Sequence, residues 1–192
     1  MNVRSLNNKV DAVGDLFNNH GIDVLCLSET WNENSDAIPV RRLRAHWFQV
    51  LERARHIADS VCTSSGNFIN HGGLAVVARC DSGLKLSRVA LPFSPTSFEC
   101  DCVRISSSGA SCLLFLLYRP GSQQASSLFF DDLARTYEFL TNQLSPIVLV
   151  GDAYVRLDRP TDPSALRFND LVKSFALRQH VTGATHILGG TL

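Results

Sequence analysis

The sequence lacks a net charge: its 192 residues carry 18 lysines and arginines against 18 aspartates and glutamates. This balance excludes polybasic proteins that hold nucleic acid by charge alone, because those proteins carry a clear basic excess. The sequence also lacks a long apolar run, and the longest, from Cys112 to Tyr118, is far too short to span a membrane. Because the chain has no basic excess, any role in nucleic-acid chemistry must come from a localised site.

The sequence has little of what marks a secreted or zinc-binding protein. Residues 1–5 contain no apolar signal core, and none of the six cysteines forms a CxxC pair or a zinc-ligand spacing with histidine. We therefore expect a reduced intracellular protein, in the nucleus or cytoplasm, with buried thiols, no signal peptide and no membrane association.

The composition is that of an ordinary globular chain, with 45% hydrophobic and 19% charged residues, and predicts a single domain over residues 1–192. Apolar residues at helical spacing predict helices over 6–20 and 126–144, and another beginning with Ser164 as N-cap. Short apolar runs after the first two helices predict buried strands at 22–27 and 147–150. Alternating helices and buried strands favour a layered α/β fold.

The middle of the chain reads differently. A buried strand is predicted at 74–78, and closely spaced strands at 84–91, 97–105 and 112–118 favour hairpins in an antiparallel or mixed sheet. Within 97–105, Glu99 and Asp101 alternate with apolar residues, which predicts one solvent-facing side. The stretch 32–70 shows no clear period and is predicted to be irregular.

Three of the predicted buried strands end in polar residues. Glu29 follows the first, Tyr118-Arg119 ends another, and Asp152 follows the strand at 147–150. Strand ends on an α/β scaffold bring side chains from a rigid backbone to a common cleft. Taken singly, each of these residues is also consistent with a turn, a helix cap or edge packing.

Together the motifs are more specific, and they occur in this order: Asn2-Val3-Arg4-Ser5-Leu6, Leu27-Ser28-Glu29-Thr30-Trp31, Gly72-Gly73-Leu74-Ala75-Val76, Tyr118-Arg119-Pro120, Val150-Gly151-Asp152 and Gly189-Gly190-Thr191-Leu192. The series resembles the endonuclease/exonuclease/phosphatase superfamily, and specifically the apurinic-endonuclease-like domain of non-LTR retrotransposons. The resemblance implies a four-layered α/β sandwich of two mixed sheets flanked by helices. It also implies a domain incomplete at the C-terminus and lacking the last strands, because the family's later Ser-Asp-His motif is absent.

The resemblance also implies roles for particular residues in metal-dependent hydrolysis of phosphodiesters. Glu29 resembles the carboxylate that binds the metal, and Asn2 resembles the polar neighbour of that carboxylate. The metal in the family is usually Mg²⁺, and Mn²⁺ can replace it. Tyr118 resembles the hydroxyl that contacts the scissile phosphate. Asp152 resembles the carboxylate that orients or deprotonates the attacking water. A cation, hydrogen-bond donors and a base around one phosphorus suit a highly charged transition state.

One motif departs from the family pattern. The family has Gly-Asp-Phe-Asn where this chain has Gly151-Asp152-Ala153-Tyr154. Loss of one preorganised donor costs on the order of 10²–10³ in rate. With the terminal Ser-Asp-His motif also absent, we expect impaired catalysis, and whether this chain is an enzyme stays open at this point.

Arginines provide further candidates for contact with phosphate. Arg119 follows Tyr118 and either adds charge to the site or makes a structural pairing, and Tyr154 stands where the family has its donor. Between residues 41 and 56 a basic stretch either lines a DNA groove or forms a solvated surface; its arginines are Arg41, Arg42, Arg44, Arg53 and Arg55.

The function that the resemblance favours is a DNA-nicking endonuclease of a retrotransposon. DNA is then the substrate, and a reverse transcriptase domain in the parent polyprotein is the implied partner. Two alternatives remain open: a phosphoesterase acting on small or lipid phosphates, and a non-catalytic relic that only binds nucleic acid or a partner.

Overall fold

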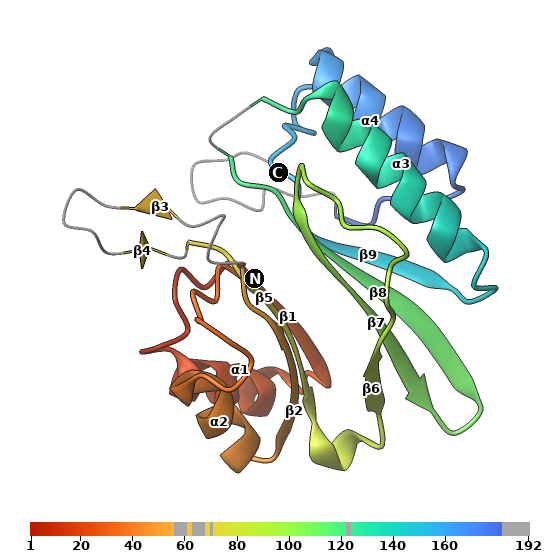
Figure 1. The fold of residues 1–192 in the computed structure, drawn as a ribbon. Coiled ribbons are helices and arrows are strands. Elements are labelled where there is room, and N and C mark those ends of the chain that lie inside the picture. Colours follow the sequence, from red (N-terminus) through yellow and green to blue (C-terminus); the bar gives the residue numbers. More distant parts are fainter. Residues whose placement is uncertain (56–60, 63–67, 70, 122–123, 182–192) are drawn as a thin grey trace.

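A computed structural model describes residues 1–55, 61–62, 68–69, 71–121 and 124–181 (Figure 1). The helices are α1 (Val10–His20), α2 (Ile38–Ala45), α3 (Ser127–Thr141) and α4 (Pro163–Ser174). The strands are β1 (Val24–Ser28), β2 (Phe48–Arg53), β3 (Val61–Cys62), β4 (Phe68–Ile69), β5 (Leu74–Arg79), β6 (Lys85–Arg88), β7 (Glu99–Ser107), β8 (Ala110–Tyr118) and β9 (Ile147–Asp152).

The first sheet has the strand order β1-β5-β2, with both pairs antiparallel, and helices α1 and α2 lie over its outer face (Figure 1). Helix α1 buries Val10, Val13 and Phe17, which recur at helical spacing. It ends at Gly21, whose left-handed conformation suits glycine. The buried face packs with Leu27 of β1 in one hydrophobic core.

The second sheet has the order β6-β7-β8-β9 and is mixed, because β8 and β9 run parallel while the other pairs are antiparallel. Helices α3 and α4 cover its outer face (Figure 1). Helix α3 begins after Ser126, whose side chain accepts a hydrogen bond from the Phe129 N–H. Its apolar face packs Leu133 and Tyr137 against Phe115 of β8 in a second core.

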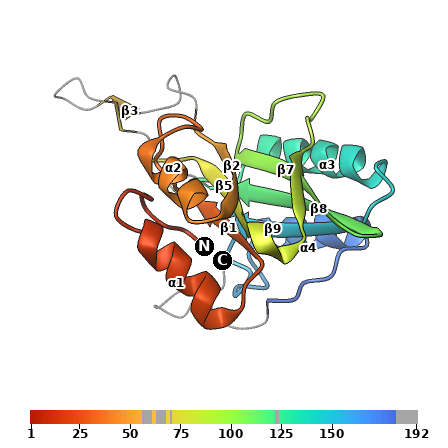
Figure 2. The ribbon, with the colours of Figure 1, turned by 90° about the horizontal axis from the view of Figure 1, so that it is seen from below.

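A third core lies between the two sheets. Leu74 and Val76 of β5 belong to it together with Val103 of β7 and Leu116 and Tyr118 of β8. Figure 2 shows the resulting order of layers, with helices outside, a sheet, a second sheet, and helices again. The predicted four-layered α/β sandwich is confirmed.

Several local predictions were wrong. The stretch predicted to be irregular contains α2 and β2, while its residues 56–60, 63–67 and 70 lie outside the described part. Asp101 on β7 is fully buried rather than on a solvent-facing side, and Val148 of β9 is 44% exposed rather than buried. Helix α4 is capped by Asp162 rather than Ser164. The Cys80 side chain is exposed, whereas the sequence predicted buried thiols.

Among the described residues no helix is both long enough and apolar enough to cross a membrane. The Gly-Gly-Thr-Leu motif at 189–192 lies outside the described residues.

The close approach of β8 to β9 leaves no room for a side chain at Gly151. Its φ is +129°, and a Cβ there would overlap the carbonyl oxygen of Leu117. Gly151→Ala is therefore expected to lower the free energy of unfolding by about 2 kcal/mol, because backbone strain costs on the order of 1–3 kcal/mol. Gly14→Ala is the control: Gly14 lies inside α1 with open space, and alanine should raise stability by about 0.5–1 kcal/mol. Urea unfolding checks both, and equal effects would contradict the strain argument.

Candidate active site

A hydrogen-bonded cluster joins the N-terminal segment, the end of β1 and the end of β8. The Asn2 amide nitrogen donates a 2.6 Å hydrogen bond to Glu29 Oε1. The Tyr118 hydroxyl donates a 2.8 Å hydrogen bond to the same oxygen. Asn2 reaches this point because it pairs with Ser28 in an isolated parallel bridge beside β1. Three residues that the sequence predicted for the site thus meet at one carboxylate.

The turn that carries Glu29 is held in an uncommon conformation. Glu29 and Trp31 have φ values of 57° and 56°, a region that residues other than glycine rarely adopt. The turn is held from both sides: the Trp31 N–H donates to the Gly72 carbonyl at 2.9 Å, and the Ser5 N–H donates to the Glu29 carbonyl at 2.8 Å. Such strain persists where surrounding structure enforces it, and it clusters at functional sites.

Asp152 lies beside this cluster, at the end of β9. Its strand runs parallel to β8 and places it in register with Tyr118. Burial raises the pKa of the Asp152 carboxyl; the Tyr154 N–H opposes this by donating a 3.2 Å hydrogen bond, and the charge of Glu29 raises the pKa further. The two carboxylates are therefore close enough to repel each other, and a bound cation would relieve that repulsion.

The Tyr154 side chain lies against the same group. Its ring centroid is 6.4 Å from that of Tyr118, with the rings nearly perpendicular, and a Cβ at Gly121 would overlap the Tyr154 ring. Burial raises the pKa of the Tyr154 hydroxyl, as do the charges of Asp152 and Glu29. The aromatic ring thus fills space beside both carboxylates.

Arg119 fixes the segment that follows β9. Its guanidinium donates 2.7 Å hydrogen bonds to the carbonyls of Ala153 and Tyr154. It also lies over the Phe129 ring, 5.4 Å from the centroid. These contacts match the structural pairing that the sequence left open, and they hold Tyr154 in place.

The family model for the Endonuclease/Exonuclease/phosphatase family matches residues 1–182. The chain belongs to this family. A search of curated proteins finds no match.

Solved structures share the fold of this family member. The endonuclease domain of TRAS1, a telomere-specific non-LTR retrotransposon, has a TM-score of 0.62 at 9% identity, covering 96% of this chain and 75% of that one. The 3′ phosphatase NExo from Neisseria, bound to a product DNA hairpin, has a TM-score of 0.58 at 18% identity, covering 90% and 68%. The human Nocturnin catalytic domain with bound sulfate has a TM-score of 0.57 at 13% identity, covering 95% and 72%.

Enzymes of the Endonuclease/Exonuclease/phosphatase family generally depend on a divalent metal, and the donors at this site suit such an ion. Glu29 and Asp152 offer carboxylate oxygens and Asn2 an amide oxygen, which are the donors that Mg²⁺ prefers. Among the described residues no group of three or more His, Cys, Asp or Glu side chains is placed to hold a metal. Mg²⁺ needs no such group, because it commonly binds through one or two carboxylates and keeps several waters.

The arginines of α2 lie apart from the Glu29 cluster. Arg41, Arg42 and Arg44 are exposed on that helix, in the outer layer of the family fold (Figure 1). Arg42 pairs with Asp11 at 3.0 Å and Arg44 with Asp36 at 3.6 Å. The structure therefore does not bring these three predicted DNA contacts to the candidate site. The other two arginines of that stretch lie elsewhere, at the end of β2.

Sequence reasoning missed one buried acid, Glu52 on β2. Its side chain is 3% exposed and accepts a 2.7 Å hydrogen bond from the hydroxyl of Thr30, the residue after Glu29. Burial raises the pKa of Glu52 from its usual 4.5 to about 7, while hydrogen bonds from Thr30 and Asn32 oppose the shift. A signal was present, because Glu52 shares the inward side of its strand with Val50 at a period of two.

Glu52 therefore makes stability depend on pH. The folded state binds its proton more tightly than the unfolded chain does, so stability is lost as pH rises from about 4.5 to 7. Glu52→Gln keeps an oxygen for Thr30 and carries no charge, and it should stabilise the protein at pH 8 by about 2.5 kcal/mol relative to its effect at pH 5. Urea unfolding at both pH values checks this, with exposed Glu138→Gln as the control. An effect of Glu52→Gln that is equal at both pH values would contradict it.

Proposed function

We propose that this chain hydrolyses phosphodiester bonds in DNA with a divalent metal ion, as the nicking endonuclease of a retrotransposon. The observation that carries the proposal is the meeting of Asn2 and Tyr118 at the Glu29 carboxylate, with Asp152 alongside. Membership of the family and the fold shared with the TRAS1 endonuclease domain support it.

Glu29 is the metal ligand in this proposal, with Asn2 fixing the orientation of its carboxylate. Mg²⁺ is the favoured ion and Mn²⁺ a substitute; when bound, the ion supplies positive charge against the phosphate oxygens as the transition state forms. Tyr118 has a single hydroxyl proton, which it donates to Glu29 here; when substrate binds, it donates its hydrogen bond to the scissile phosphate instead. Burial, followed by the hydrogen bond to Glu29, raises the pKa of the Tyr118 hydroxyl far above its usual value, so it keeps its proton at any working pH.

Asp152 orients the attacking water and accepts its proton. The water oxygen bonds to phosphorus while the bond from phosphorus to the leaving strand oxygen breaks, and that oxygen takes up a proton from solvent. Burial raises the pKa of Asp152 and so makes it a better proton acceptor than a solvated aspartate. Its position at the end of β9, in register with Tyr118, places base and hydroxyl on neighbouring strands.

DNA as the substrate rests on two of the structural likenesses. The NExo structure contains a product DNA hairpin, and the TRAS1 domain is that of a telomere-specific retrotransposon. In this proposal a reverse transcriptase domain in the same parent polyprotein uses the nick. A second candidate is a phosphoesterase acting on small phosphate groups, such as a terminal 3′ phosphate, favoured by the fold shared with NExo, a 3′ phosphatase.

A panel of substrates tests the two candidates. Purified protein is incubated in Mg²⁺ with supercoiled plasmid, with a DNA hairpin ending in a 3′ phosphate, and with a small phosphodiester. The proposal expects open-circular plasmid as the main product, and none in EDTA. Release of phosphate from the hairpin without plasmid nicking would favour the second candidate. No turnover of any substrate would leave only a binding role and contradict both.

A further inference from the structure

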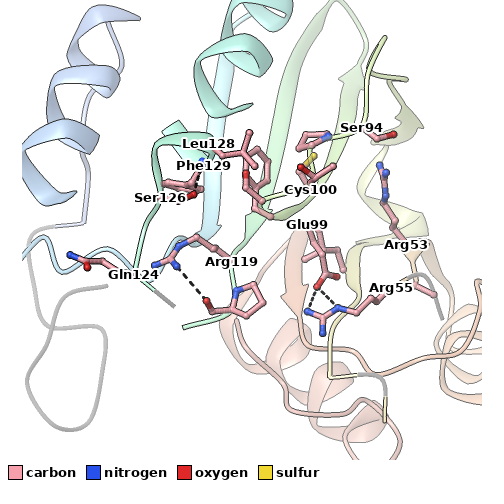
Figure 3. Close-up of a pocket in the computed structure, with 17 residues that line it drawn as sticks. Arg53, Arg55, Ser94, Glu99, Cys100, Arg119, Gln124, Ser126, Leu128 and Phe129 are labelled. Atoms are coloured by element: carbon pink, nitrogen blue, oxygen red, sulfur yellow. Dashed lines mark hydrogen bonds and ion pairs between the residues drawn. The ribbon is translucent and has the colours of Figure 1, made fainter. Parts of the chain in front are cut away.

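A cavity of about 850 Å³ opens beside the Glu29 cluster. Its walls come from the end of β2, the start of β7, the residues after β8 and the start of α3 (Figure 3). It adjoins the candidate active site because Glu99, on its wall, is the antiparallel partner of Tyr118. The Glu99 carboxylate also accepts a 2.7 Å hydrogen bond from the Gly73 N–H, and the Gly73 carbonyl accepts one from Thr30. A ligand bound there would lie beside the end of β8 that carries Tyr118.

The charged lining of this cavity is positive. Three arginines face one glutamate, which leaves an excess of two positive charges. Arg55 and Glu99 form an ion pair whose side chains are largely buried, so this part of the wall is fixed. Arg119 is held by the backbone carbonyls described above. An excess of positive charge in a partly enclosed cavity favours an anion.

Arg53 differs from the other two arginines. It is the last residue of β2 and is exposed, and Figure 3 shows its side chain standing at the cavity wall apart from the Arg55–Glu99 pair. Within the described part of the chain its guanidinium has no hydrogen bond or ion pair, so no carboxylate must be displaced before it binds a ligand. A guanidinium is a strong donor to phosphate oxygens, because it can donate two parallel hydrogen bonds.

Part of the opposite wall, beside the polar Gln124 and Ser126, is apolar. Leu128, in the first turn of α3, is 52% exposed although leucine is usually buried, and Phe129 lies behind it. Figure 3 shows Leu128 and Phe129 across the cavity from Arg53. A cavity with a cationic group on one side and an apolar wall on the other matches the two parts of a nucleotide, its phosphate and its base. Its volume lies in the range of pockets that hold small ligands, roughly 300–1,000 Å³.

We propose that this cavity binds one nucleotide of the DNA strand adjacent to the cleaved bond, with its phosphate on Arg53 and its base against Leu128. The inference rests on the proposed function for its choice of DNA, and it adds a subsite that anchors the substrate outside the catalytic cluster. Arg53 and Leu128 then set how tightly DNA is held, without taking part in bond breaking.

Binding of a fluorescein-labelled DNA duplex, measured by anisotropy in EDTA, tests the subsite without any need for hydrolysis. Arg53→Ala should raise Kd about tenfold and reduce the slope of log K against log salt by about 1. The matched control is Arg79→Ala. Arg53 pairs with the first residue of β5, whereas Arg79 is the last residue of that strand and forms an ion pair with Asp81 at the surface. Equal losses of affinity in the two variants, or no binding of DNA by the unmodified chain, would overturn the proposal.

The base contact has its own test. Single abasic sites are placed in turn along a strand of the duplex, and one of them should weaken binding to the unmodified protein severalfold. The same abasic site should cost little in Leu128→Ala, because the contact is already lost. An equal cost in both proteins would overturn this half of the inference. Because these readouts are binding constants, an inactive protein that depends on Arg53 would contradict the proposed function alone.

Discussion

Glu29→Gln is expected to lower the rate of Mg²⁺-dependent DNA nicking by about 10²–10³-fold, because a bound metal supplies several kcal/mol of transition-state stabilisation and each 1.4 kcal/mol is about tenfold. Glutamine keeps the shape and an oxygen that can accept the hydrogen bonds from Asn2 and Tyr118. The fold around the strained turn should therefore survive, while the negative charge that holds the cation is lost. Single-turnover nicking of supercoiled plasmid measures the change.

Glu138→Gln provides the matched control for this substitution. Glu138 is exposed on α3, in the helix layer that covers the outer face of the second sheet, and the chemical change is identical (Figure 2). Its nicking rate should equal that of the unmodified chain. If both variants nick at the unmodified rate, Glu29 is not the metal ligand.

Tyr154→Asn is expected to act in the opposite direction and raise the nicking rate by about 10–100-fold. It restores the amide of the family's Gly-Asp-Phe-Asn pattern, and a preorganised donor is worth on the order of 10²–10³ in rate. The backbone favours the change, because Tyr154 has a φ of 48° and asparagine is enriched in that region. Asparagine also removes the ring that now lies beside the Asp152 and Glu29 carboxylates.

Tyr154→Ala separates the two effects of that substitution. It removes the same ring without supplying an amide. If the amide donor raises the nicking rate, the alanine variant should show less than a tenth of the gain in rate of the asparagine variant. Circular dichroism of both variants checks that the segment held by Arg119 stays folded. A gain in the alanine variant as large as in the asparagine variant would show that bulk alone limits the rate.

The parts of the fold with the clearest periodicity were predicted well. Helix α1 and strands β5 and β8 lie close to their predicted positions, because their apolar residues repeat at a single period or form one continuous run. The region 32–70 was missed because α2 is only eight residues long and carries three arginines, so its buried Val40 and Leu43 give little apolar signal.

Buried charge explains two further failures. Asp101 follows the period of a solvent-facing residue, yet it is fully buried because that face of β7, with Val103, is turned toward the first sheet; Arg88 of β6 balances its charge with a 2.8 Å ion pair. Glu52 is buried beside a neutral partner instead, and accepts a hydrogen bond from the Thr30 hydroxyl. The period of two placed Glu52 beside Val50, but the group that accompanies each acid into the interior lies elsewhere in the chain, so spacing alone did not predict the burial of either residue.

The structure places several of the predicted site residues close together. Glu29, Tyr118 and Asp152 were chosen because they end buried strands, and parallel pairing of β8 with β9 brings the last two into register. The basic stretch was read as one unit, but the structure divides it between the outer helix α2 and the cavity at the end of β2. Which arginines face the substrate depends on how strands are ordered, and spacing along the chain does not reveal that order.

The most direct test of the metal-dependent site at Glu29 is the initial rate of plasmid nicking as a function of Mg²⁺ concentration, for the unmodified chain and for Glu29→Gln. If Glu29 holds a hard cation, the nicking rate of the unmodified chain should rise with Mg²⁺ concentration and saturate. The nicking rate of the variant should stay low over the same range. A rate independent of Mg²⁺, or the same saturating curve in both proteins, would contradict it.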